Sequence, residues 1–348
     1  MANKTQQTSG NVTVPEHARK ALQAREVGNF LSNYAIIIII SIMVLAVGFS
    51  KPNFWTLDNG KNLIINIAPR FIIAAGVSGC LITKGTDLSA GRLVGLSACV
   101  AATVLQEVGY GARFFPNMPD LPVIVGLLIA VAITALFGMI NGMVIAWLKV
   151  PPFIATLGMQ TIVYGICQIY TGNAPQGGLK DSYKAVANGS LFGVIPYLFL
   201  FALVVGVFMW LLYNKTRHGK YMYAIGGNEN AAAVAGVNVP ATLIRIYTLA
   251  GALYGLAGFL LGAKAGGAST ATGFGYELEA IAACTIGGVS TNGGVGTVPG
   301  ILLGVLVFEV LKICLQYMQV NPAYTYIAQG IVIVVAVALD LRKYLAKK

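Results

Sequence analysis

Residues 191–214 read LFGVIPYLFLFALVVGVFMWLLYN, a long and continuous apolar run. A helix needs about 20 mainly apolar residues to cross the hydrocarbon core of a bilayer, whereas a β-barrel strand is a short segment of alternating polarity. The run therefore indicates a membrane-spanning α-helix. Of the 348 residues, 57% are hydrophobic and 10% are charged, and the mean hydropathy is +0.75. Since a soluble globular domain carries about 25% charged residues, the whole chain is predicted to be a helical membrane protein.

Similar apolar runs recur along the chain and predict an all-α, polytopic bundle of about ten transmembrane helices. The eighth run is too short and glycine-rich for a full span, so we predict a broken or re-entrant element there, covered by other helices or a water-filled cavity. The runs make one transmembrane domain, 34–341, between an N-terminal segment, 1–33, and a basic tail, 342–348. The predicted spans lie near 34–50, 62–83, 90–108, 121–148, 153–171, 191–213, 241–263, 278–289, 296–318 and 323–341.

Lysine and arginine residues are distributed unevenly about these spans, and such residues concentrate in cytoplasmic loops. With the N-terminus inside, fifteen of them fall on the cytoplasmic side, including Arg92, and seven fall outside, including Arg70, while Lys312 lies within a span. Both termini and the segment 214–240 are therefore predicted to be cytoplasmic. The net charge of +11 indicates membrane orientation and attraction to anionic lipid, with no nucleic-acid partner.

Several kinds of catalytic motif are missing from the sequence. No G-x-x-x-x-G-K-[ST] phosphate loop, H-E-x-x-H helix, nucleophile elbow or carboxylate cluster occurs. The five cysteines fall in or beside apolar segments without the paired spacing of metal ligands, and we expect buried free thiols. The chain is predicted to bind no ATP, metal or other cofactor, and not to be an enzyme.

Charged residues within a span usually have a function, because burying them is costly. Glu309 and Lys312 are three residues apart and can meet on one face of a helix. A self-neutralising structural pair is the favoured interpretation, and a pair lining a solute pathway is the alternative. Glu277 and Glu279 precede the eighth element, where carboxylates favour a helix N-terminus, and a structural role is again favoured.

The segment 218–239, HGKYMYAIGGNENAAAVAGVNV, interrupts two apolar runs with small and polar residues. It predicts a helix of about two turns, capped by an asparagine, with a glutamate in its first turn, an alanine-rich body and a glycine that ends it before Pro240. So short a helix is not stable alone in water, so it must pack against something. Either it rests on the protein's own inner surface, or it inserts into a groove on a cytoplasmic partner. The residues that make up this predicted helix and its ends are Asn228, Glu229, Ala231, Ala232, Ala233 and Gly236.

Two glycine-rich stretches precede predicted spans: ITKGTDLSAGR, residues 82–92, and ACTIGGVSTNGGVGTVPG, residues 283–300. Asp87 or Ser89 is expected to cap the third span, and Thr291 or Asn292 the ninth. Residues 62–108 weakly resemble 278–318, which suggests a parallel internal repeat with a pathway near its interface. The glycines permit turns and close helix packing, and they are also candidate hinges. The residues singled out are Gly85, Asp87, Ser89, Gly91, Gly288, Gly293, Gly294 and Gly296.

These two stretches, together with AIGGNENAAAVAGVNV at 224–239, resemble the permeases of bacterial ABC importers of monosaccharides. The likeness covers nearly the whole chain, and the three motifs together are highly specific. It implies a multi-pass protein of the bacterial cytoplasmic (inner) membrane that forms a homodimer in contact with lipid. It also implies that the segment 214–240 is a coupling loop, with 229–236 docking into a cytoplasmic ATPase that uses ATP and Mg²⁺, and that an extracytoplasmic binding protein delivers the sugar.

Within that family, TDLSAGR, YAIGGN and VNPAYTYIAQG look like the members for galactose and methyl-galactoside, while ribose-type members tend to carry I-D-L-S-V-G at the first stretch. Galactose import is therefore the expected function, and import of another monosaccharide such as ribose is the alternative. Two further hypotheses belong to other classes. An ion-coupled secondary transporter would work without an ATPase, and a membrane scaffold would move no solute.

Overall fold

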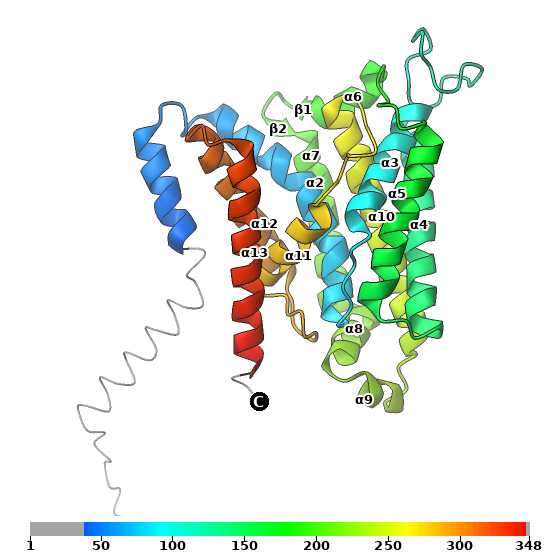
Figure 1. Ribbon diagram of the computed structural model, residues 1–348, viewed down its shortest axis with the longest axis vertical. Coiled ribbons are helices and arrows are strands. Elements are labelled where there is room, and N and C mark those ends of the chain that lie inside the picture. Colours follow the sequence, from blue (N-terminus) through cyan, green and yellow to red (C-terminus); the bar gives the residue numbers. More distant parts are fainter. Residues whose placement is uncertain (1–37, 346–348) are drawn as a thin grey trace, which may run out of the picture.

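The computed structural model describes residues 38–345 and is a bundle of α-helices with one small hairpin (Figure 1). The predicted segment 1–33 and the last three residues of the predicted basic tail lie outside the described residues. In chain order the elements are a helix Ile38–Ser50, α2 Leu57–Ile82, α3 Ala90–Val104, α4 Val123–Trp147, α5 Pro152–Thr171, α6 Asp181–Asn188, β1 Ser190–Leu191, β2 Ile195–Pro196, α7 Tyr197–Lys215, α8 Arg217–Gly227, α9 Glu229–Val234, α10 Val239–Ala265, α11 Tyr276–Ile286, α12 Val298–Tyr317 and α13 Pro322–Leu345.

Each of the ten predicted apolar segments coincides with a helix, and six of these helices are long and apolar enough to cross a membrane. The eighth is the 11-residue α11, which is shorter than a span, as predicted. The start predicted at 191 was wrong, because 190–196 forms the antiparallel hairpin β1–β2 and α7 begins at Tyr197. The internal repeat stays a prediction. It would pair α2 with α11 and α3 with α12, and these helices differ in length: α2 has 26 residues against 11 in α11, and α3 has 15 against 20 in α12.

The core is built around α2 and α10, the most buried of the six long apolar helices, since 67% and 72% of their apolar stretches of 18 residues are buried. Helices α4 and α10 approach closely through glycines, and a Cβ at Gly138 would lie 2.2 Å from the Tyr247 carbonyl oxygen. Both helices repeat small residues four apart, at Gly138 and Gly142 and at Gly251 and Gly255. This spacing lets helix backbones pack closely where lipid provides no hydrophobic drive for association.

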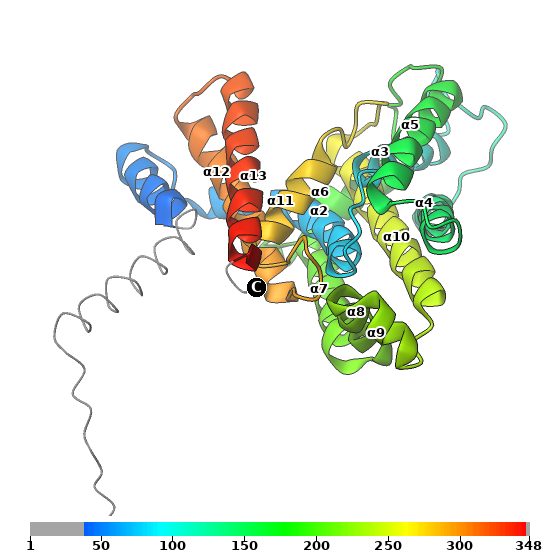
Figure 2. The ribbon, with the colours of Figure 1, turned by 60° about the horizontal axis from the view of Figure 1, so that its bottom comes forward.

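Helices α4, α5 and α7 lie on the periphery, and only 22% of the apolar stretch of each is buried. Large apolar side chains such as Leu128, Ile169 and Val204 are therefore exposed. A continuous apolar surface of this kind suits a protein surrounded by hydrocarbon rather than water. Figure 2 shows α11–α13 on one side and α3, α4, α5 and α10 on the other, with α2 between them.

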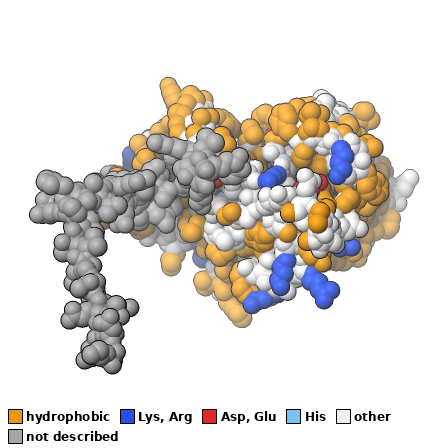
Figure 3. Space-filling model, turned by 90° about the horizontal axis from the view of Figure 1, so that it is seen from below, with side chains coloured by type: hydrophobic (Ala, Val, Ile, Leu, Met, Phe, Trp, Pro, Cys, Tyr) orange, Lys and Arg blue, Asp and Glu red, His pale blue; other side chains and the backbone are white. Residues whose placement is uncertain are grey.

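The two ends of the bundle differ. Helices α8 and α9 lie at the same end as the last turn of α13, whereas α6 and the hairpin lie at the opposite end (Figure 1). Viewed from the α8–α9 end, lysine and arginine side chains stand on a face bordered by hydrophobic side chains (Figure 3). The segment 214–240 and the C-terminal end of α13 thus lie at the same end of the bundle, and the cytoplasmic side assigned to them stays a prediction.

Candidate functional site

The segment 214–240 folds as two short helices, α8 and α9. The hydroxyl of Thr216 accepts a hydrogen bond from the amide of Gly219 and caps α8, which the sequence did not reveal as a separate helix. Asn228 caps α9 as predicted, because its Oδ1 accepts a hydrogen bond of 3.0 Å from the amide of Ala231. Such a cap stabilises a helix by about 1 kcal/mol. The cap therefore fixes the residue at which α9 begins, although this helix has only six residues.

The end of α9 also follows the sequence prediction. Gly236 has a φ of +86°, the left-handed conformation that commonly ends a helix. Asn238 then accepts a hydrogen bond from the amide of Ala241 and caps α10, with Pro240 in its first turn. The turn between α9 and α10 is thus fixed by residues whose preferences are local.

The alanines of α9 divide between two faces. Ala232 is 4% exposed and packs inward, whereas Ala231 and Ala233 are exposed and Val234 is 91% exposed. Glu229 lies 3.7 Å from Lys149, but both side chains are more than half exposed, so the pair contributes little to stability. The exposed side of α9 thus carries Glu229 beside small apolar side chains, and α9 stands at one end of the molecule (Figure 2).

The first glycine-rich stretch is organised around a buried carboxylate. Asp87 is 1% exposed, and its Oδ1 accepts hydrogen bonds from the amide and hydroxyl of Ser89, while its Oδ2 accepts one from the hydroxyl of Tyr254 at 3.1 Å. Asn141 also donates to the Ser89 hydroxyl. The predicted capping of the third span was wrong, because Ser89 stands at the N-cap of α3 without a side-chain capping bond and Asp87 bonds Ser89 instead. The carboxylate holds the connection between α2 and α3 against α4 and α10.

Two glycines of this stretch lie where a side chain would collide. A Cβ at Gly85 would lie 2.3 Å from the Tyr247 hydroxyl, and one at Gly91 would lie 2.4 Å from the Gly273 carbonyl oxygen and 2.0 Å from Glu277. The α3 backbone therefore touches the loop before α11. These contacts support the packing interpretation, and a hinge role stays a prediction.

The second glycine-rich stretch turns sharply between α11 and α12. Gly288, Gly293 and Gly294 all have positive φ, and Gly296 packs against the Ile82 side chain. The expected cap of the ninth span was wrong. Instead, the hydroxyl of Thr297 caps α12 by accepting a hydrogen bond of 3.2 Å from the amide of Gly300.

Thr291 and Asn292 have other roles in this stretch. The carboxylate of Asp340 on α13 accepts hydrogen bonds from both the amide and the hydroxyl of Thr291, at 3.1 and 2.8 Å. The amide of Asn292 donates to the hydroxyl of Ser290. The turn is therefore tied to the last helix, a connection that the sequence did not suggest.

Glu309 and Lys312 meet as predicted, with 3.2 Å between Oε1 and Nζ, but they belong to a larger network. Arg70 on α2 lies 2.9 Å from Glu309 and 3.3 Å from Glu279 on α11, and Lys312 lies 2.7 Å from Glu279. Two cations and two carboxylates thus balance inside the bundle and join three helices. Arg70 does not belong to an outside loop, as the charge count had it, because it lies within α2.

Arg92 was likewise assigned to a cytoplasmic loop and lies within α3. Its guanidinium group stacks on Tyr164 at 4.1 Å and on Phe274 at 4.9 Å, and it donates to the Thr270 carbonyl. Glu277 lies three residues after Phe274 and is 5% exposed, and no described residue forms a hydrogen bond with its Oε2. Glu277 is thus buried and Arg92 half-buried, and Glu277 lies beside the Gly91 contact.

The sequence contained a signal for part of this network. Arg70 lies inside the predicted span 62–83, so the rule applied to Glu309 also calls for a buried partner of Arg70. The partnership of Glu279 and the anchoring by Asp340 depend on helices far apart in the chain, and no local pattern reveals them. The five described cysteines are free and buried, as predicted.

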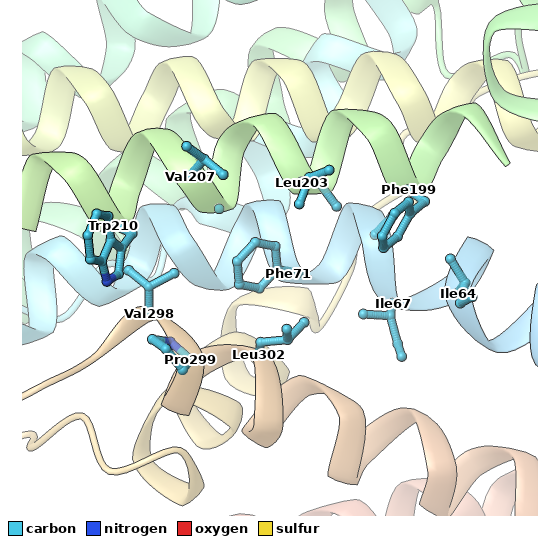
Figure 4. Close-up of a pocket in the computed structure, with 13 residues that line it drawn as sticks. Ile64, Ile67, Phe71, Phe199, Leu203, Val207, Trp210, Val298, Pro299 and Leu302 are labelled. Atoms are coloured by element: carbon cyan, nitrogen blue, oxygen red, sulfur yellow. The ribbon is translucent and has the colours of Figure 1, made fainter. Parts of the chain in front are cut away.

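A cavity of about 400 Å³ lies between α2, α7 and α12 (Figure 4). Phe71, Leu203 and Leu302 contribute to its wall, and the indole nitrogen of Trp210 is its only polar side-chain atom. A sugar needs several converging polar groups in its binding site. This cavity therefore suits a hydrocarbon chain and not a sugar of the kind that the sequence resemblance predicts.

Comparison with known proteins agrees with this architecture. The family model described as the permease component of branched-chain amino acid transport systems matches residues 60–337. The chain belongs to this permease family. No solved structure matches the permease.

Three relatives of the permease span almost its full length. The galactose/methyl galactoside import permease of Escherichia coli K12 is 44% identical over 94% of this chain and 99% of the relative, and that of Haemophilus influenzae is 43% identical over the same shares. The ribose import permease of Bacillus subtilis is 37% identical over 92% of this chain and 94% of the relative.

Proposed function

We propose that this permease forms the membrane pathway of an ATP-driven importer for galactose and methyl-galactoside. The observation that carries the proposal is the identity of 43–44% to the galactose/methyl galactoside import permeases of Escherichia coli and Haemophilus influenzae over 94% of the chain, against 32–37% for the ribose import permeases compared. The likeness extends through all the motifs described above. The permease itself moves the sugar and catalyses no bond chemistry.

The proposed importer contains further subunits. A cytoplasmic ATPase binds and hydrolyses ATP with Mg²⁺, an extracytoplasmic binding protein delivers the sugar, and a second copy of the permease completes the pathway. All ten predicted spans then cross the bacterial inner membrane or re-enter it, with both termini cytoplasmic. ATP and the loaded binding protein drive transport by favouring different conformations of the permease.

The exposed face of α9 is the proposed docking element for the ATPase. Glu229, Ala231 and Ala233 project from a helix that is capped at its start by Asn228 and ended by Gly236. Small side chains allow a close approach of two backbones, and a preformed helix reduces the entropy lost on binding. These features support docking of α9 in a groove.

The four-membered charge network supports an ATP-driven importer over an ion-coupled transporter, because its carboxylates are already paired with cations. One observation favours the alternative: Glu277 is buried with an unpartnered oxygen, as a proton-coupling carboxylate would be. Ribose is the alternative substrate, supported by the 37% identity to the ribose import permease of Bacillus subtilis.

Uptake into reconstituted vesicles tests the proposal. The permease, its candidate ATPase and its binding protein are combined, and labelled galactose, methyl-galactoside and ribose are followed with and without ATP. We expect ATP-dependent galactose uptake that stops when the ATPase is omitted. ATP-dependent uptake of ribose instead of galactose would identify ribose as the substrate and leave the ATP-driven mechanism intact. Uptake by the permease alone under a proton or sodium gradient, abolished by Glu277→Gln, would establish ion coupling instead.

A further inference from the structure

The segment 214–240 and both glycine-rich stretches meet at one place, although they lie far apart in the sequence. The amide of Gly294 donates to the Ile82 carbonyl at 2.8 Å, and the hydroxyl of Tyr223 donates to the Gly296 carbonyl at 2.7 Å. Lys84 donates to the Gly227 carbonyl at 3.3 Å. Each of the three segments is therefore bonded to both of the others. We call this meeting point the glycine junction, made of Ile82, Lys84, Tyr223, Gly226, Gly227, Gly293, Gly294 and Gly296.

The backbones at the glycine junction are in direct contact. A Cβ at Gly226 would lie 1.8 Å from the Ile82 carbonyl oxygen and 2.5 Å from the Gly294 amide nitrogen. A Cβ at Gly293 would lie 2.8 Å from the Gly226 carbonyl oxygen, and its φ of +83° disfavours any side chain. Because no flexible side chains separate these backbones, a displacement of α8 must move the other two segments or break their hydrogen bonds.

Helix α8 is fixed to the bundle more firmly than α9. Met222 and Ile225 on α8 are 1% and 2% exposed, whereas Ala232 is the one buried residue of α9. A displacement of α9 therefore reaches the bundle through α8 as well as through the turn into α10, and the C-terminal turn of α8 lies at the glycine junction.

The second glycine-rich stretch extends this connection to two further helices. Asp340 ties the stretch to α13 through Thr291, and the stretch leads directly into the first turn of α12. Gly287 approaches α12 so closely that its Cβ would lie 2.1 Å from the Gly300 carbonyl oxygen. Helices α2, α12 and α13 are thus all linked to α8 through the glycine junction and the second glycine-rich stretch.

We infer that Tyr223 is a positioning residue that holds α8 against the second glycine-rich stretch and so transmits movement of α9 to the helices of the pathway. The inference rests on the proposed docking of the ATPase at α9. Of the three links at the glycine junction, that of Tyr223 is a short side-chain bond that is partly shielded from solvent, and its ring also packs edge-on against Tyr213 at 6.1 Å. Removing the hydroxyl alone loosens the junction and leaves that packing in place.

The test compares Tyr223→Phe with Tyr221→Phe, the same chemical change at an exposed tyrosine of α8. Each variant is purified with the ATPase and reconstituted, and ATP hydrolysis is measured with and without galactose-loaded binding protein, together with galactose uptake per ATP. For Tyr223→Phe we expect normal co-purification of the ATPase. We also expect the stimulation by the loaded binding protein and the uptake per ATP to fall about fivefold, the factor that one hydrogen bond contributes to an equilibrium. Tyr221→Phe should match the unmodified importer.

Each other outcome has a distinct meaning. Normal stimulation and uptake in Tyr223→Phe would overturn the inference and leave the proposed function intact. Loss of ATPase co-purification in Tyr223→Phe would also overturn it, because Tyr223 would then shape the docking surface and not transmit its movement. If the unmodified permease takes up galactose without any ATPase, the proposed function itself fails, and the role of Tyr223 fails with it.

Discussion

Arg70 on α2 lies 2.9 Å from Glu309 on α12, measured from Nε to Oε1, and each residue belongs to a helix long and apolar enough to cross a membrane. The Glu309 side chain is 2% exposed, so its charge depends on this partner and on Lys312. The pair joins the central helix α2 to the group α11–α13, while Asp87 joins the α2–α3 connection to α10. Polar contacts thus fix α2 to both sides of the molecule.

Removing Arg70 should destabilise the protein strongly. Arg70→Met leaves the buried Glu309 and the half-buried Glu279 with Lys312 as the one cation of the network, and an unpaired buried charge costs about 3 kcal/mol or more. We expect a clear fall in the melting temperature of the purified protein in detergent. The double variant Arg70→Met with Glu309→Met restores the charge balance, and it should recover part of the loss. Lys184→Met, which breaks the exposed pair with Asp181, is the control and should change little.

Gly91 should tolerate no side chain. Gly91→Ala places a Cβ 2.4 Å from the Gly273 carbonyl oxygen, which is backbone and cannot rotate away. Overpacking of this kind costs about 1–3 kcal/mol. Gly158→Ala on α5 is the matched control, because a Cβ there meets no atom within 4 Å, and alanine favours the helix by about 1 kcal/mol. The two variants should shift the melting temperature in opposite directions, and equal shifts would refute the close approach.

The sequence predicted those features that depend on neighbouring residues. Apolar length located the helices, Asn228 was identified as a cap and Gly236 as a terminator, because each preference acts over a few residues. Asp87 and Thr291 also stand before helices, yet neither caps the expected helix. Instead, Asp87 accepts a hydrogen bond from Tyr254, and Thr291 donates one to Asp340, and both partners lie on distant helices. Tertiary contacts overrode the local preference at both positions.

The charge network and the glycine junction were beyond sequence reasoning for the same reason. Apart from Glu309 and Lys312, which share a helix, their bonded partners come from segments between 33 and 239 residues apart, and one sequence does not show which segments touch. A charged residue inside a span indicates that a partner is required but does not identify the partner. The glycines indicate close contact without naming the surface contacted.

Acidification should reduce stability through His218. Burial, together with the positive charge of Arg245, lowers the pKa of His218, so the folded protein keeps the imidazole neutral where the unfolded chain takes up a proton. Stability from this source is fully present above the unfolded pKa of about 6.5 and is lost as the pH falls below it. The melting temperature should therefore drop less between pH 7.5 and 5.5 in His218→Gln than in the unmodified protein. Parallel pH profiles would contradict this assignment.

The two faces of α9 should respond differently to bulky residues. Ala233 is exposed, so Ala233→Trp should leave the melting temperature unchanged and block the proposed groove, which lowers co-purification of the ATPase at least tenfold. Such a loss corresponds to about 1.4 kcal/mol of binding free energy. Ala232 is 4% exposed against the protein itself, so Ala232→Trp should lower the melting temperature as well as ATPase binding. Ala231→Ser, a small change on the exposed face, is the control for both. If Ala233→Trp binds the ATPase normally, α9 is a surface helix without a docking role, because a groove that accepts alanine closely has no room for an indole ring.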